Sequence, residues 1–150
     1  MSVASRVKSR KFESASQEAV VALLVSAAVV LQRTNDLLRR HGLTHDQYNV
    51  LRILRGAEPH GHPRGEIGRR MMSRAPDVTR LLDRLERQGL VARGWDPDNR
   101  RLSIARITRQ GHALLEAADP EVLALQTEVT RGLGVDDLKA LARACDHIAK

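Results

Sequence analysis

Apolar residues dominate the chain between residues 17 and 40, where the run "AVVALLVSAAVVL" occupies positions 19–31. A helix that is apolar all round must pack against more than one neighbour. We therefore predict a long helix here, with one face on the chain's own core and another on a second molecule. The run of thirteen residues is shorter than the roughly 20 that span a bilayer, so we expect no membrane span.

A second helical pattern follows "GLT" at residues 42–44. Gly42 is suited to end the preceding helix, and Thr44 with Gln47 has the spacing of a capping box. Apolar residues then repeat at helical spacing, which predicts a helix over about 45–55. The next segment, "GAEPHGHP", is rich in Gly, Pro and His and predicts a loop.

Two further helices are expected, a short one in "RGEIGRRMM" and a longer one over residues 73–89 that Gly89 closes. At 100° per residue the longer helix has two faces. Its inner face carries Val78, Leu81, Leu82 and Leu85, and its outer face carries Ser73, Pro76, Arg80, Asp83, Arg84 and Arg87. Ser73 is the expected N-cap, with Pro76 in the first turn. The pair has the pattern of a helix-turn-helix unit.

Two strand-like segments come next, "LVARGW" and "LSIARIT", around the turn sequence "DPDNRR". Asp96 and Pro97 favour a turn, because the first supplies a side-chain acceptor and the second a fixed φ. Strands directly after a recognition-type helix predict a wing. Arg100 and Arg101 then lie at its tip, where they can reach an adjacent minor groove.

The rest of the chain is again helical in pattern. Residues 109–134 predict a helix that is interrupted or kinked near Asp119 and Pro120. In the segment after it, apolar side chains are spaced by three, four and three residues at Leu138, Leu141, Cys145 and Ile148. That spacing predicts an interface seam.

Basic charge is concentrated in one part of the chain. The formal net charge is +7, and residues 62–109 hold 12 arginines against 6 acidic residues, with no lysine. Arginine suits planar recognition of phosphates and base edges. We infer a polyanionic partner. The single cysteine excludes an internal disulfide and fits a reducing cytoplasm.

Three stretches, "GLTHDQYNVLRIL", "SRAPDVTRLLDRLERQGLVAR" and "DPDNRRLSIARITRQG", together resemble the MarR family of winged helix-turn-helix transcriptional regulators. The family's wing pattern, Asp-x-Arg and then Leu-Thr, falls on Asn99, Arg101, Ile107 and Thr108. Asn99 replaces a carboxylate that would orient Arg101, a role that Asp96 or Asp98 would have to take. Ile107 replaces the usual Leu.

The resemblance implies a mainly α fold, with a winged helix-turn-helix DNA-binding domain at 44–109 and dimerisation helices at 17–43 and 110–150. The first residues are polar and basic without a helical period, so we predict a flexible arm at 1–16. It also implies a homodimer on pseudo-palindromic double-stranded DNA, of a kind that is commonly a repressor released by a small ligand, an oxidant or a metal.

The residues expected to contact DNA lie on the recognition helix and the wing. They are Ser73, Arg74, Asp77, Thr79, Arg80, Arg84, Arg100 and Arg101. Arg80 is the best candidate for reading a base edge, because Arg pairs bidentately with guanine; a phosphate or solvent contact is the alternative. Arg84 is expected to contact a phosphate.

Three other features of the sequence bear on function. His60 and His62, with His41 and His45, invite a metal site, but neither Cys nor paired carboxylates join them at ligand spacing, so we expect neither metal nor cofactor. We expect the thiol of Cys145 to be buried and to pack within the apolar seam. Enzyme motifs such as a phosphate-binding Gly loop or a nucleophile elbow are missing from the sequence. A metal-responsive regulator of this fold and a winged-helix module for protein or RNA remain alternatives.

Overall fold

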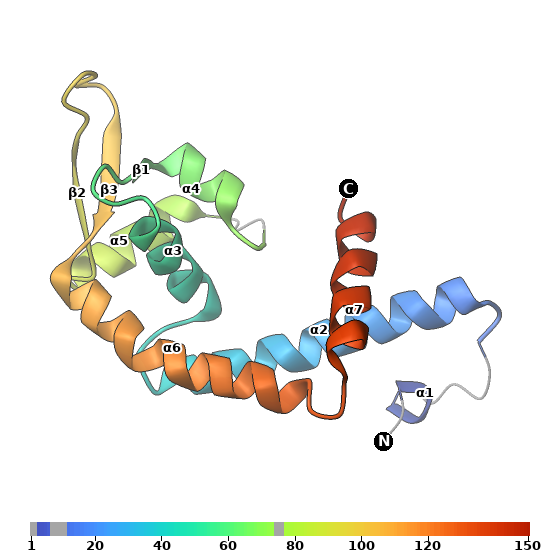
Figure 1. Ribbon diagram of the computed structural model, residues 1–150. Helices are drawn as coiled ribbons and strands as arrows, with labels where there is room; N and C mark the ends of the chain where they lie inside the picture. Colours follow the sequence, from blue (N-terminus) through green and yellow to red (C-terminus); the bar gives the residue numbers. More distant parts are fainter. Residues whose placement is uncertain (1–2, 7–11, 74–76) are drawn as a thin grey trace.

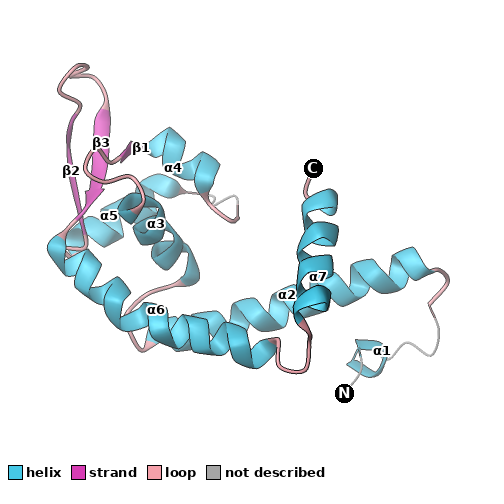
Figure 2. Ribbon diagram, viewed as in Figure 1, coloured by secondary structure: helices cyan, strands magenta, loops and turns pink. Residues whose placement is uncertain are grey.

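The protein is mainly helical, with one small antiparallel sheet, in a computed structural model that describes residues 3–6, 12–73 and 77–150 (Figures 1 and 2). The elements in chain order are α1 (Val3–Arg6), α2 (Ala15–Arg39), α3 (His45–Arg55), β1 (His62–Pro63), α4 (Arg64–Arg70), α5 (Val78–Arg87), β2 (Val91–Trp95), β3 (Ser103–Ile107), α6 (Arg109–Val129) and α7 (Val135–Ile148). The predicted mainly α fold with a small winged sheet is therefore confirmed.

Helices α3, α4 and α5 and the sheet surround the main hydrophobic core. Its fully buried side chains include Leu51, Leu54, Ile67 and Leu85. The inner face predicted for α5 is confirmed, because Leu82 and Leu85 are buried while Val78 and Leu81 pack at the edge of the core. The capping box of Thr44 and Gln47 is also present at the start of α3.

The start of the recognition helix differs from the prediction. Ser73 is not the N-cap; α5 begins at Val78, and the Asp77 carboxylate accepts a hydrogen bond from the Arg80 backbone N–H at 3.0 Å. Ser73 instead donates its hydroxyl to Asp46 at 3.1 Å. Ser73 and Asp77 can both cap a helix. Asp77 is the N-cap, because its side-chain oxygen accepts a hydrogen bond from the backbone N–H three residues later. The predicted place of Pro76 lies outside the described residues.

The sheet has the order β1-β3-β2, with both pairings antiparallel. Strands β2 and β3 confirm the predicted wing. The loop prediction for residues 56–63 was wrong at its end, where His62 and Pro63 pair with Ala105 and Ile104 as an edge strand. This pairing is to a distant part of the chain, so local composition could not reveal it.

Helix α6 runs without interruption through Pro120, so of the two predicted forms, an interruption or a kink, the interruption is wrong. Buried Leu115, Ala118 and Val122 on either side of the proline supply packing that offsets the lost backbone hydrogen bond. The neighbouring Asp119 carboxylate accepts hydrogen bonds from the Tyr48 hydroxyl at 2.6 Å and from Arg55 at 2.7 Å. These contacts tie α6 to α3.

The long N-terminal helix is buried only near its C-terminal end, at Leu37 and Leu38. Its apolar part has a mean hydropathy of 1.6 over 18 residues, none of it buried in this chain, and the helix is long and apolar enough to cross a membrane. The expectation of no membrane span was based on the thirteen-residue apolar run alone, and the helix that contains this run is longer. Length and composition alone do not separate a membrane helix from one that packs on a second protein.

Gly61 lies in the turn before β1, which pairs with β3. A substitution at Gly61 tests how closely the backbone packs at the base of the wing. Its φ is +75°, and a Cβ there would lie 2.3 Å from the Ala105 carbonyl oxygen. Gly42 has a similar φ of +72° with open space around it. We predict that Gly42→Ala lowers the free energy of unfolding by about 1 kcal/mol and Gly61→Ala by about 3 kcal/mol, measured by urea denaturation. Equal losses for the two variants would contradict the clash.

Asp119 makes stability depend on pH. Burial raises the pKa of this carboxyl, but the hydrogen bonds from Tyr48 and Arg55 outweigh burial and lower it below its ordinary value. Burial and the bond to Asp119 raise the pKa of Tyr48 to about 12. A carboxyl with a lowered pKa stabilises the fold above its ordinary pKa and loses this effect as pH falls through the lowered value.

We therefore predict that Asp119→Asn costs about 2 kcal/mol of unfolding free energy at neutral pH, and that the difference from the natural chain shrinks below about pH 4. Urea titrations across this pH range measure it. Glu116→Gln, an exposed change on the same helix, is the control and should be near neutral throughout. A penalty for Asp119→Asn that stays constant down to acid pH would rule out the charged carboxylate as its source.

Candidate nucleic-acid interface

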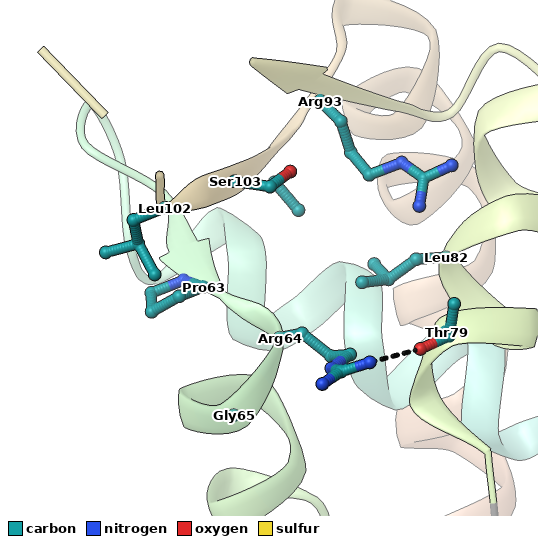
Figure 3. Close-up of a pocket in the computed structure, with 9 residues that line it drawn as sticks. Pro63, Arg64, Gly65, Thr79, Leu82, Arg93, Leu102 and Ser103 are labelled. Carbon is teal, nitrogen blue, oxygen red and sulfur yellow. Dashed lines mark hydrogen bonds between the residues drawn. The ribbon is translucent and has the colours of Figure 1, made fainter. Parts of the chain in front are cut away.

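Helices α4 and α5 form the helix-turn-helix unit, and a side-chain contact joins them. Arg64, the first residue of α4, donates a hydrogen bond from its guanidinium to the Thr79 hydroxyl at 2.9 Å (Figure 3). A Cβ at Gly68 would lie 3.5 Å from Val78, so the two helices approach closely there. The pair therefore presents α5 in a fixed orientation.

The outer face of α5 carries the arginines that the sequence predicted. Arg80 is 80% exposed, and its guanidinium lies 3.2 Å from the Asp77 carboxylate. Arg84 is exposed, and its guanidinium forms neither a hydrogen bond nor an ion pair with the residues that the structure describes. A free guanidinium in the middle of this face is available to a phosphate or a base edge.

The wing is fastened to α5 by Arg93 of β2. Its guanidinium lies 2.6 Å from Asp83 and 2.9 Å from Glu86, which are neighbours on the surface of α5. The hydrogen bonds to Glu86 and Asp83 raise the pKa of Arg93, and those from Arg93 lower the pKa of Glu86. The same ion pairs offset one of the two negative charges that would otherwise repel a polyanion beside the recognition helix.

The tip of the wing is held by side-chain to backbone hydrogen bonds. The Asp96 carboxylate accepts from the N–H groups of Asp98 and Asn99 at 2.8 and 2.9 Å, and the Asn99 side-chain oxygen accepts from the Arg101 N–H at 3.1 Å. Asn99 therefore positions the backbone of Arg101, an action that needs no carboxylate. Asp96 is committed to the turn and does not pair with Arg101. Arg100 and Arg101 are both exposed.

A hollow of about 320 Å³ separates the wing from α4 and α5 (Figure 3). It is lined by Pro63, Arg64, Gly65, Thr79, Leu82, Arg93, Leu102, Ser103 and Ala105. Arg64 and Arg93 lie at this junction, and the sequence analysis assigned a role to neither. The charge concentration in residues 62–109 included both, but only their long-range partners reveal what they do.

The predicted DNA contacts are brought together in part. Thr79, Arg80 and Arg84 lie on α5 with Asp77 at its cap, and Arg100 and Arg101 lie on the wing tip. Ser73 lies before the helix, and Arg74 lies outside the described residues. The hydroxyl of Thr79 is engaged by Arg64.

The histidines do not converge on one site. His112 contacts Glu58, and His41 lies 3.2 Å from Glu121. Among the described residues, no group of three or more His, Cys, Asp or Glu side chains is placed to hold a metal ion. Cys145 was predicted to be buried, but it is half-exposed in the single chain because α7 buries none of its residues.

Comparison with known proteins places this interface in a family. The model of the MarR family matches residues 43–103. The MarR transcription factor of Planctomyces limnophilus is 33% identical in a structural match that covers 91% of this chain and 98% of that one, with a TM-score of 0.70. An uncharacterized HTH-type transcriptional regulator of Bacillus cereus is 34% identical over 64% of this chain, and the match spans 62% of that relative's length.

Two further structures are similar over most of the chain. CouR from Rhodococcus jostii RHA1, bound to p-coumaroyl-CoA, is 25% identical, with coverage of 92% and 96% and a TM-score of 0.79. A transcriptional repressor CouR bound to a 23-mer DNA duplex is 29% identical, with coverage of 87% and 91% and a TM-score of 0.75. From the match to the family model and the near-complete match to a 33% identical member, the chain belongs to the MarR family of transcriptional regulators.

Proposed function

We propose that this protein is a homodimeric repressor that binds a pseudo-palindromic operator and responds to a small-molecule effector in the cytoplasm. The observation that carries the proposal is the surface of α5 and the wing, where exposed Arg80 and Arg84 stand beside a hairpin with exposed Arg100 and Arg101. Residues 44–109 make up this DNA-binding unit. The similar repressor bound to a DNA duplex supports double-stranded DNA as the partner.

The dimer is proposed from the apolar surface that the single chain leaves open. On α2, Val20, Leu24 and Leu31 are 50%, 64% and 45% exposed, and on α7, Leu141 and Ile148 are 50% and 61% exposed. Such surface is costly to leave in water. We assign it to a second copy of the chain, with residues 17–43 and 110–150 as the dimerisation helices. The ion pairs of α2 with α6, such as Arg33 with Glu128 at 2.7 Å, favour an aqueous location for this helix pair.

A small-molecule effector is the third part of the proposal. It rests on the similar CouR structure, which holds p-coumaroyl-CoA, and on the family's general mode of regulation. An enzymatic activity is not part of it.

The dimer proposal predicts that removing α7 from Val135 onward gives monomeric or aggregated protein without operator binding. Because a truncated chain can also fail to fold, Leu141→Glu in the full chain is the sharper variant: a charge in the apolar seam should shift the dimer toward monomer. Light scattering measures the mass, and exposed Lys139→Glu on the same helix is the control. A soluble truncated monomer with full DNA affinity would contradict the proposal.

The DNA proposal predicts different behaviour for the two arginine sites. Arg80→Ala should lose about 1 to 3 kcal/mol per half-site on a duplex selected from a randomised library, with little change on random DNA. Arg101→Ala should weaken both and reduce the salt dependence by roughly one phosphate equivalent per wing. Fluorescence anisotropy at several salt concentrations measures both effects.

Arg131→Ala, which removes the same charge from the exposed turn after α6, is the control for these variants. If Arg101→Ala leaves affinity and salt slope unchanged, the wing tip is not a DNA contact. If Arg80→Ala lowers specific and random binding equally, Arg80 contacts a phosphate instead of a base.

A further inference from the structure

The wing carries an exposed aromatic side chain that the arginine contacts do not account for. Trp95 is the only tryptophan in the chain. It is the last residue of β2, opposite Ser103 of β3, and it is 66% exposed. A single exposed apolar residue is common on protein surfaces. Whether Trp95 has a role in binding therefore depends on where its side chain points and which residues surround it.

Strand alternation places the indole on the side of the wing that faces the recognition helix. Side chains two positions apart on a strand lie on the same face, so Trp95 shares a face with Val91 and Arg93. Val91 is buried in the core, and Arg93 forms its ion pairs with α5. The hairpin continues beyond α4 and α5 (Figure 1). The face that α5 covers at Arg93 is therefore open two residues further on.

The charges around the indole are balanced. Trp95 lines a shallow hollow with Asp96, Pro97 and Arg100. Asp98 and Arg101 complete the charged groups of the turn, so two carboxylates stand against two guanidiniums. A contact of this tip with DNA that relied on charge alone would be weak. An apolar contact would add affinity that does not depend on the net charge.

We propose that Trp95 is a DNA contact of the wing, with its indole packed against the deoxyribose edges of the minor groove next to the major groove that α5 enters. The proposal rests on the proposed DNA-binding function and deepens it. Apolar side chains are regularly used against the minor groove, and an aromatic ring loses little conformational entropy when it is covered. Trp95 then supplies the apolar part of a contact whose charged part comes from Arg100 and Arg101.

The single tryptophan makes a direct test possible. Unlabelled duplex of about two helical turns, selected from a randomised library with the natural protein, is titrated into the full chain while tryptophan emission and its quenching by acrylamide are followed. We expect the emission to change and the quenching to fall along the same binding curve that anisotropy of the labelled duplex gives. If the duplex binds while both tryptophan signals stay constant, the inference is overturned and the proposed function stands.

Variants separate the apolar contact from the charged one. Trp95→Ala should weaken binding about five- to tenfold per wing, as expected for partial burial of a large aromatic side chain, and should leave the salt slope unchanged. Trp95→Phe should retain most of the affinity, and Arg101→Ala is the comparison that lowers the slope. Thermal unfolding of each variant confirms that the fold is intact.

Three outcomes contradict the inference. The first is natural affinity in Trp95→Ala. The second is a fall in acrylamide quenching that follows protein concentration in the absence of DNA, which would assign the indole to contact with another copy. The third is failure to recover any binding duplex from the library, which would also remove the proposed function on which the inference rests.

Discussion

The ion pairs of Arg93 with Asp83 and Glu86 set the geometric relation on which this protein's proposed function depends, that between the wing and the recognition helix. A two-stranded hairpin is marginally stable on its own, and its tip arginines reach a groove at a useful place only if its base is fixed. The guanidinium bridges two carboxylates on α5 from a strand that also packs into the core. Its hydrogen bonds hold the wing to α5, and its positive charge offsets one of the two negative charges that Asp83 and Glu86 would otherwise present to DNA.

Other contacts extend this fixed geometry through the chain. Arg64 joins α4 to Thr79 of α5, and Asp119 joins α6 to Tyr48 and Arg55 of α3. The winged unit and α6 thus form one connected body. In contrast, α7 buries no residue in its own chain. The chain therefore combines a connected winged unit with a helix that lacks packing partners in its own chain, which is the arrangement expected if the proposed operator is bound by two copies.

Sequence reasoning succeeded where the determinants are local. The capping box at Thr44, the inner stripe of α5 and the turn chemistry at Asp96 depend on residues a few positions apart, and the structure contains all three. It failed where distant residues decide. Pairing with β3 made a strand of His62 and Pro63, and packing around Pro120 kept α6 continuous. The hydroxyl of Ser73 bonds to Asp46 of the distant α3, and Asp77 caps α5, which begins at Val78. Family resemblance predicted a role for Arg101 but none for Arg93. Arg93 forms ion pairs with α5, and these contacts are visible only in the three-dimensional structure.

Hydroxyl-radical footprinting on the promoter next to the protein's own coding region tests most directly whether two copies of this surface read one symmetric DNA site. We predict protection on one face of the duplex in two inverted half-sites about 10 bp apart from centre to centre, flanked by protected minor-groove positions where the wings lie. Protection of a single short site without inverted symmetry, or no protection at protein concentrations that saturate a selected duplex, would contradict it.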